Sequence, residues 1–439
     1  SSLQARWQKL LFARENEYRR LSESLELAYP SYYQEKYSLQ DWKIKDIQAS
    51  LNARQQLIEY FWGEKQLFIF KITAQSVQLE SVAIDPSLPQ ALQRVQRFVS
   101  KPNASEQAYQ QYQEDSYFLY EQLVGNVDAR YDELIIIPDG PLGYLPFDAL
   151  LTSAVKEADK LRYHELPYLL QQYRLYYQYS AALLLQAATK SRGAKLAYGG
   201  FAPSYPALPN AQRGVQMVLN QDLSQLVFTK EEVSNTQSIW GGKAYLDEAA
   251  TKEIFLQEAA DYKLLHLAMH GLLSGENTEF AALAFHPSSD SAGEFLLSME
   301  EIAAMELSAD LVVLSACETG AGRLRRGEGI ISMARAFREA GCPNILMSLW
   351  TADDKSSTLI MQDFFGRLKS GDKIAEAIRA AKLELMSTQL LQSHPYYWAG
   401  FVPLGNPNDR KSNSHLLLIG LMLLMGVGLG FMAYRKAEV

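Results

Sequence analysis

The chain has 439 residues, which is long for one ordinary domain and indicates two or three. Hydrophobic residues make up 48% of it and charged residues 21%, so most of the chain is expected to be globular rather than disordered. The formal net charge is -8, which argues against a general nucleic-acid-binding protein, because such proteins are normally basic. Two cysteines cannot build a disulfide framework, and they indicate a reducing compartment.

The first part of the chain, residues 1–51, is predicted to be a short helical segment. It begins with Ser1 rather than methionine, so we expect a piece of a longer protein. Apolar residues recur at helical steps over 3–29, and a capping-box pattern at Ser38 starts a second helix that runs to about Leu51. Two interpretations stay open: the end of a helical-repeat array, or a helical hairpin packed on the next domain.

Residues 52–192 are predicted to form a first α/β unit. Three segments rich in β-branched and aromatic residues predict a small meander, namely Leu57–Phe61, Leu67–Ile72 and Val77–Ala83. Helical patterns follow at 87–100 and 105–125. The continuous apolar run Glu133–Ile137 is typical of a central strand covered on both faces. Residues 190–194 are predicted to be a linker.

Residues 193–407 alternate between strand and helix patterns, which predicts a mostly parallel sheet with helices on its faces. The predicted strands are Lys195–Tyr198, Tyr262–Met269, Leu311–Ser315, Asn344–Leu349 and Trp398–Val402. The predicted helices lie near 249–260, 328–340, 355–369 and 373–388. Ligands bind beyond the carboxyl ends of the strands in such sheets, so the residues that follow each strand are the first candidates for a site.

Two of these strand ends carry residues with catalytic chemistry. His270 follows one apolar strand and Cys317 follows another, and each enters a turn marked by glycine. An imidazole beside a thiol is the minimum for nucleophilic acyl transfer, because the imidazole takes the thiol proton and the thiolate attacks a carbonyl. An isolated cysteine is more often a small buried hydrophobic residue. The matching positions of the two residues favour the catalytic interpretation.

Metal and nucleotide sites are not expected. His266 lies four residues before His270 in an extended strand, roughly 13 Å away, so we predict a core or interface residue. A zinc-protease motif would need glutamate directly after His266, where Leu267 stands, and no cysteine pair has ligand spacing. Residues 322–327 imitate a phosphate loop, but Glu328 stands where lysine is required. We predict that residues 320–329 form a loop at the rim of the site that orders on activation, with Glu328 at the start of the next helix.

Several segments resemble the CHAT family of caspase-like cysteine peptidases, which are relatives of separase. The matching segments are Ile137–Leu150, Leu196–Ala202, Leu265–Gly271, Leu314–Gly329, Ala334–Gly341, Ser348–Asp354 and His394–Gly405, within residues 55–407. The resemblance implies a mostly parallel α/β sheet with an active caspase-like half at 193–407 beside a degenerate half at 52–192. It also implies that His270 is the base and Cys317 the nucleophile, with the backbone amides of Gly271 and Cys317 as the oxyanion hole.

The resemblance implies a cysteine endopeptidase that cuts a protein partner without a cofactor or a metal. Members of the family act in bacterial defence or regulated cell death, some of them beside gasdermin-like pore formers, and many follow helical repeats that sense a partner. The expected partners are therefore a protein substrate, an upstream helical-repeat or sensor element and the membrane, but not nucleic acid. The alternative is a catalytically silent scaffold that keeps the fold and binds peptide or protein.

Two carboxylates near the predicted site have two interpretations. Asp353 and Asp354 follow the strand that ends at Trp350, and in caspase relatives this strand edge borders the first specificity pocket. An acidic pocket formed by these three residues would favour Arg or Lys before the scissile bond. The alternative is that one of the aspartates caps the helix that begins at Lys355.

The C-terminal segment Leu416–Tyr434 contains no charged residue. A helix of this length rises about 1.5 Å per residue and nearly crosses a hydrocarbon core of about 30 Å. We therefore predict a single transmembrane helix after a linker at 408–415, with a buried core helix as the alternative. Because a catalytic thiol needs reducing surroundings, the peptidase is expected to face the cytoplasm.

Overall fold

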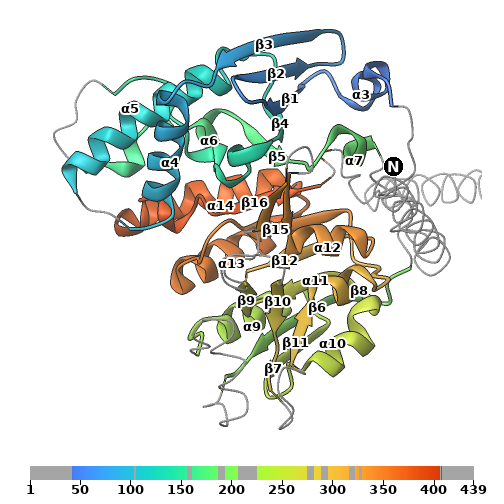
Figure 1. The fold of residues 1–439 in the computed structure, drawn as a ribbon. Coiled ribbons are helices and arrows are strands. Elements are labelled where there is room, and N and C mark those ends of the chain that lie inside the picture. Colours follow the sequence, from blue (N-terminus) through green and yellow to red (C-terminus); the bar gives the residue numbers. More distant parts are fainter. Residues whose placement is uncertain are drawn as a thin grey trace, which may run out of the picture.

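The computed structural model describes residues 42–102, 105–155, 161–185, 193–205, 225–273, 281–287, 295–315, 322–325, 329–405 and 407. Within these residues, one mixed sheet of eleven strands runs through the molecule with helices on both faces (Figure 1). Its strands, in spatial order, are β3 (Val77–Ala83), β2 (Gln66–Ile72), β1 (Gln55–Trp62), β4 (Glu133–Ile137), β5 (Arg174–Tyr177), β16 (Phe401–Leu404), β15 (Asn344–Ser348), β12 (Leu311–Leu314), β8 (Tyr262–Leu267), β6 (Leu196–Pro203) and β7 (Lys243–Asp247).

The first half of the sheet contains the predicted meander. β1, β2 and β3 are antiparallel neighbours, and β1 then pairs in parallel with β4, which pairs in parallel with β5. The predicted helices are also present, as α4 (Ser87–Val99) and α5 (Glu106–Leu123), and a shorter helix α3 (Ile44–Ser50) precedes β1. α4 and α5 pack on each other, and the hydroxyl of Tyr60 in β1 donates to the carbonyl of Leu123 at the end of α5, at 2.9 Å.

The turn after β4 is structural. Asp139 accepts hydrogen bonds from the backbone N–H groups of Trp62 and Gly140, at 2.8 Å each. Gly140 has a positive φ of 59°, and an added Cβ would lie 3.1 Å from Cβ of Trp62, so glycine suits this turn. The carboxylate at this strand end therefore shapes the backbone.

The second half of the sheet is parallel, as expected, apart from its last strand. β6, β8, β12 and β15 are parallel neighbours, whereas β16 is antiparallel to β15. The helices α9 (Thr229–Trp240) and α13 (Asp354–Ser370) lie on one face, and α10 (Lys252–Glu258), α11 (Met299–Ala303) and α12 (Met333–Glu339) lie on the other (Figure 1). Opposite faces of β6 carry these contacts: Tyr198 meets Phe365 of α13, and Phe201 meets Phe255 of α10.

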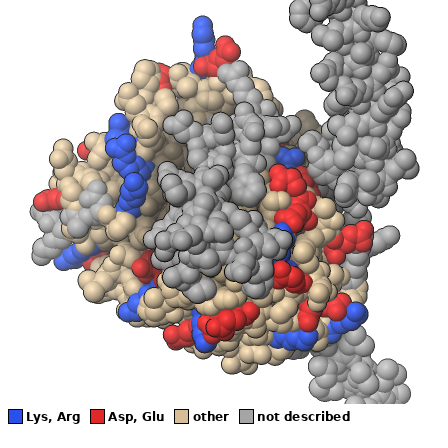
Figure 2. All heavy atoms as spheres, turned by 60° about the horizontal axis from the view of Figure 1, so that its bottom comes forward, with Lys and Arg blue, Asp and Glu red and all other residues tan. Residues whose placement is uncertain are grey.

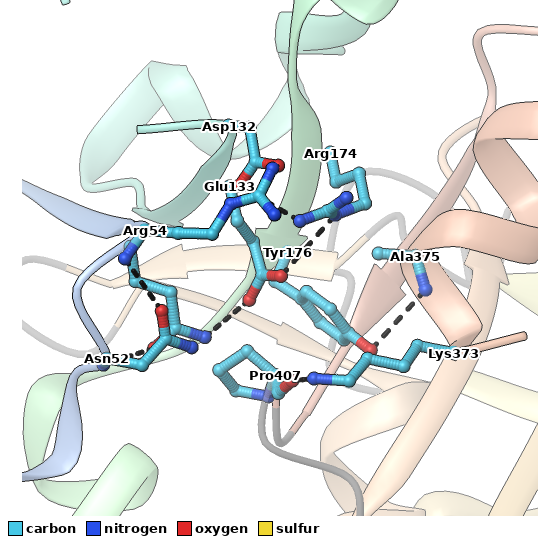
Figure 3. A network of polar contacts seen from close by, with 10 residues as sticks. Asn52, Arg54, Asp132, Glu133, Arg174, Tyr176, Lys373, Ala375 and Pro407 are labelled. Carbon is cyan, nitrogen blue, oxygen red and sulfur yellow. Dashed lines mark hydrogen bonds and ion pairs between the residues drawn. The ribbon is translucent and has the colours of Figure 1, made fainter. Parts of the chain in front are cut away.

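The two halves share one sheet because β16 pairs with β5 through Leu404 and Tyr177. The helix α14 (Ile374–Thr388) supports this junction, since the backbone N–H of Ala375 donates to the hydroxyl of Tyr176 at 3.4 Å. Figure 3 shows the contact of Tyr176 with Ala375 beside an ionic network in which Arg174 meets Asp132 and Glu133. The network lies at the amino ends of β4 and β5, away from the edge where parallel sheets hold their ligands.

Some predicted boundaries were wrong for local reasons. Residues 329–332 form β14 (Gly329–Ser332), which pairs with β13 (Gly322–Arg325), so the helix predicted from 328 begins at Met333. The last strand begins at Phe401 rather than Trp398, because His394 caps a 3-10 turn at Pro395–Tyr397 that occupies the preceding residues. A second sheet, formed by β9 (His270–Leu273), β10 (Ala281–Ala284) and β11 (Leu296–Ser298), was not predicted.

Among the described residues, no helix is long and apolar enough to cross a bilayer. The described residues do not include the predicted helix at 3–29, the predicted linker at 408–415 or the predicted span at 416–434. Of the predicted linker at 190–194, they include only 193 and 194.

Candidate active site

The candidate site lies at the carboxyl ends of the parallel strands in the second half. β8 and β12 are direct neighbours, with Leu267 opposite Leu314 in their last pair. The two strands therefore end side by side, which the sequence alone left open. His270 follows β8 and is described, whereas Cys317 lies outside the described residues, and Ser315 is the last described residue before it.

His270 is held by contacts from two neighbouring elements. It is only 9% exposed, and it begins β9 opposite Ala284 of β10. Its backbone N–H donates to the hydroxyl of Tyr205 at 3.1 Å, and that hydroxyl donates to the carbonyl of Ala284 at 2.7 Å. The two rings also lie 4.9 Å apart between centroids. Tyr205 therefore fixes both the backbone and the ring of His270.

Sequence reasoning missed Tyr205, although a signal was present. Tyr205 stands two residues beyond Pro203, at the carboxyl end of β6, and β6 is the direct neighbour of β8. Gly271, the predicted oxyanion-hole residue, lies in β9 opposite Leu283. Its role as a hydrogen-bond donor to a substrate remains a prediction.

A buried polar network lies under these strand ends. His266 is completely buried, as predicted for a core residue, but it is not surrounded only by apolar groups. Its Nε2 lies 2.7 Å from Oε1 of Glu232 and 3.2 Å from Oγ of Ser315, and its Nδ1 lies 3.0 Å from the hydroxyl of Tyr198. Ser315 donates to the same oxygen of Glu232 at 2.6 Å. Only the tertiary fold brings Glu232, from α9, into this network.

The glycine at position 200 makes room for the network. A Cβ added there would lie 2.3 Å from the hydroxyl oxygen of Tyr198 and 2.6 Å from Cγ1 of Val233. Gly200 is opposite His266 in the β6–β8 pairing, so its missing side chain leaves the space in which Tyr198 reaches the imidazole.

The three residues of the predicted specificity pocket all have structural contacts. Trp350 is 7% exposed, and its indole N–H donates to the carbonyl of Tyr396 at 3.1 Å. Asp353 is the N-cap of α13, where it accepts from the backbone N–H of Ser356 at 2.9 Å, as the capping alternative predicts. Asp354 accepts from the backbone N–H of Val227 at 2.9 Å. Burial raises the pKa of Asp354, while these backbone hydrogen bonds oppose the shift. The acidic pocket remains a prediction.

The other cysteine, Cys342, lies in a different environment. It is fully buried, and burial raises the pKa of its thiol far above the usual range. Such a thiol stays protonated and inert, because the thiolate is the reactive form.

Within the described parts of the chain, no group of three or more His, Cys, Asp and Glu side chains is arranged to hold a metal ion. On the face drawn in Figure 2, Lys and Arg side chains form one narrow streak at the left and elsewhere lie beside Asp and Glu side chains, and the described surface there shows no broad basic area.

Comparisons with known proteins agree with this architecture. The CHAT domain matches residues 81–406. Tetratricopeptide repeat protein 28 of Mus musculus is 25% identical over 341 residues, which cover 67% of this chain and 13% of that protein. Its Homo sapiens counterpart is 33% identical over 130 residues, covering 30% and 5% of the two proteins. The chain thus spans only a small part of the curated relatives that it matches.

A solved structure shows the same fold. The Saccharomyces cerevisiae separase in the separase–securin complex superposes with a TM-score of 0.50 at 10% sequence identity, over 83% of this chain and 31% of that chain. This likeness concerns the fold alone, and it agrees with the large, mostly parallel sheet of the caspase-like architecture. Because the CHAT domain covers most of its length, the chain belongs to the CHAT-domain family.

Proposed function

We propose that the chain is a cysteine endopeptidase in which Cys317 is the nucleophile and His270 the general base. The observation that carries this proposal is the pairing of β8 with β12, since their carboxyl ends lie side by side. His270 stands just beyond one strand end and Cys317 just beyond the other. A thiol and an imidazole on neighbouring strand ends suit acyl transfer.

The proposed reaction proceeds in two halves. His270 takes the proton of the Cys317 thiol, and the thiolate sulfur bonds to the carbonyl carbon of the scissile peptide. The backbone N–H groups of Gly271 and Cys317 stabilise the resulting oxyanion, and the absence of a side chain at Gly271 leaves room for the carbonyl. The C–N bond then breaks, and the amine leaves with the proton from His270. Water hydrolyses the thioester and restores the thiol.

The partners and the location of the enzyme are also proposals. Both curated relatives are named as tetratricopeptide repeat proteins, which supports the interpretation of residues 1–51 as the end of a helical-repeat array that senses a partner. We further propose that residues 416–434 anchor the chain in a membrane. The substrate would be a protein partner, such as a gasdermin-like pore former in bacterial defence or regulated cell death. A tether raises the local concentration of a substrate that is itself at the membrane.

The direct test is to incubate the purified chain with candidate partner proteins and to identify the cut ends by mass spectrometry. The wild type and Cys342→Ala should produce the same cut ends, and Cys317→Ala should produce none. If a partner binds but is never cut, the scaffold alternative is correct. If Cys317→Ala cuts at the wild-type rate, the proposed nucleophile is wrong.

A further inference from the structure

The network of Glu232, His266 and Ser315 is costly to bury. The side chain of Glu232 is 2% exposed and that of His266 is 0% exposed, so both groups have lost nearly all contact with water. Replacing such buried polar groups with apolar ones of similar size is often neutral for stability or even favourable. Stability alone therefore does not account for a carboxylate and an imidazole at this point of the core.

The geometry of the network points to a role at the ends of the strands. A carboxylate oxygen is an acceptor, so Nε2 of His266 and Oγ of Ser315 both donate to Oε1 of Glu232, at 2.7 and 2.6 Å. His266 belongs to β8, and Ser315 directly follows β12. A single oxygen from a helix thus ties two neighbouring strands together where their backbone pairing ends.

The helix that carries this oxygen is itself anchored. Oδ2 of Asp354, at the start of α13, accepts from the backbone N–H groups of Val227 and Phe228 at 2.9 and 3.5 Å, just before α9 begins. Glu232 is in the first turn of α9. This contact therefore fixes the position of the Glu232 carboxylate relative to the sheet.

We propose that Glu232, His266 and Ser315 are positioning residues for the peptidase reaction, an inference that rests on the proposed function. One residue separates Ser315 from Cys317, and three residues separate His266 from His270. The two hydrogen bonds to Oε1 of Glu232 fix the end of β8 and the backbone at Ser315, which lead to His270 and Cys317. They thereby align the imidazole with the thiol. A displacement of about 1 Å at such a site can cost about 100-fold in rate.

The two cysteines allow a sharp test. A Cys342→Ala background leaves Cys317 as the single thiol of the chain. In this background we compare Glu232→Gln and Ser315→Ala with Glu231→Gln and Ser238→Ala. The control residues are exposed on α9, and Glu231→Gln makes the same chemical change one residue away. The measurements are kcat and KM for a peptide that spans the cut site found by mass spectrometry, the pH profile of Cys317 alkylation by iodoacetamide, and the melting temperature.

We expect Glu232→Gln and Ser315→Ala to lower kcat by about 10- to 100-fold with little change in KM. The midpoint of the alkylation profile should move up towards about 8.5, the value for a free cysteine, because the imidazole no longer stabilises the thiolate. Ser315→Thr keeps the hydroxyl and should restore most of both properties. If Glu232→Gln does not fold, the Ser315 variants carry the test alone, since Ser315 is only half-buried.

Two results would overturn this inference while leaving the proposed function intact. One is a wild type that cleaves and variants whose kcat and profile equal those of the controls. The other is a lower melting temperature with an unshifted profile, which would make the network purely structural. A wild type that neither cleaves nor shows a lowered alkylation midpoint would instead overturn the proposed function, and the inference with it.

Discussion

The ammonium group of Lys382 and the carboxylate of Asp148 form an ion pair inside the molecule, although they stand 234 positions apart in the chain. Both side chains are almost completely buried, at 0% and 3% exposure. Lys382 belongs to α14 and Asp148 to the 3-10 turn Phe147–Ala149 of the first half. The pair therefore joins the two halves of the fold, beside the junction of β5 and β16.

Removing one partner of this ion pair should lower the stability of the protein strongly. Lys382→Met leaves the Asp148 carboxylate buried without a partner, which costs about 3–5 kcal/mol in the free energy of unfolding. Urea denaturation measures this loss. The exposed residue Lys355 supplies the control, and Lys355→Met should change stability little. Combining Lys382→Met with Asp148→Leu should recover most of the loss, and a double variant as unstable as the single one would contradict the role of charge.

Substituting the catalytic residues should remove the activity without unfolding the protein. Cys317→Ala should abolish cleavage because it removes the nucleophile, and His270→Ala should lower kcat by about 100- to 10,000-fold because it removes the proton acceptor. Both variants should keep the melting temperature of the wild type within a few degrees. Cys342→Ala should stay active, and its inactivation without unfolding would move the nucleophile to the buried thiol.

The hydroxyl of Tyr205 should matter for activity. Tyr205→Phe keeps the ring beside His270 but removes the acceptor of the His270 N–H and the donor to Ala284. An unpaired buried group costs about 1–3 kcal/mol. We expect lower stability together with about a tenfold lower kcat, because the imidazole loses one constraint. Tyr117→Phe, which removes a surface hydrogen bond to Glu121, is the control and should change neither quantity. Equal kcat values in the two variants would contradict a positioning role.

Stability should fall in mild acid because of His394. Burial between Phe98 and Tyr163 lowers the pKa of His394 to about 4, from 6.5. Between pH 6.5 and about 4, the unfolded chain binds a proton at His394 that the folded chain does not. The free energy of unfolding therefore has its full value above about pH 6.5 and decreases as the pH falls towards about 4. The shift corresponds to about 3 kcal/mol in the free energy of unfolding.

The control for this effect is His394→Asn, which keeps an acceptor for the backbone N–H of Tyr396 but does not titrate. Urea midpoints measured across this pH interval should slope less in the variant than in the wild type. Parallel slopes would show that other groups cause the acid sensitivity.

The C-terminal segment should decide where the protein partitions. Deleting residues 414–439 should move the chain to the soluble fraction and leave peptide cleavage unchanged. Leu423→Arg places a charge in the middle of the span and should weaken membrane insertion in the same way, because a charged side chain there costs several kcal/mol, about 3 on insertion scales. A full chain that is already soluble after cell fractionation would contradict the anchor.

Local patterns in the sequence were enough to predict the elements that have strong periods or long apolar runs. The apolar run at β4, the alternation of the meander and the helical periods of α13 and α14 all reflect burial by near neighbours in the chain. For the same reason, the sequence placed His270 and Cys317 at strand ends. The short strand β5 and the helix α9 carry weak patterns of this kind and were missed.

By itself, the sequence determined the resemblance to the family, the strands and helices that have strong local patterns, and which residue types follow the strand ends, because these depend on neighbours within a few positions. Only the tertiary structure decided that β8 lies beside β12, that Tyr205 holds His270, and that Glu232 reaches His266 and Ser315. The physical reason is that these contacts join residues far apart in the chain. The packing of α9 against α13 and the sheet, for example, brings Glu232 to His266 and Ser315, and no period in the sequence displays this contact.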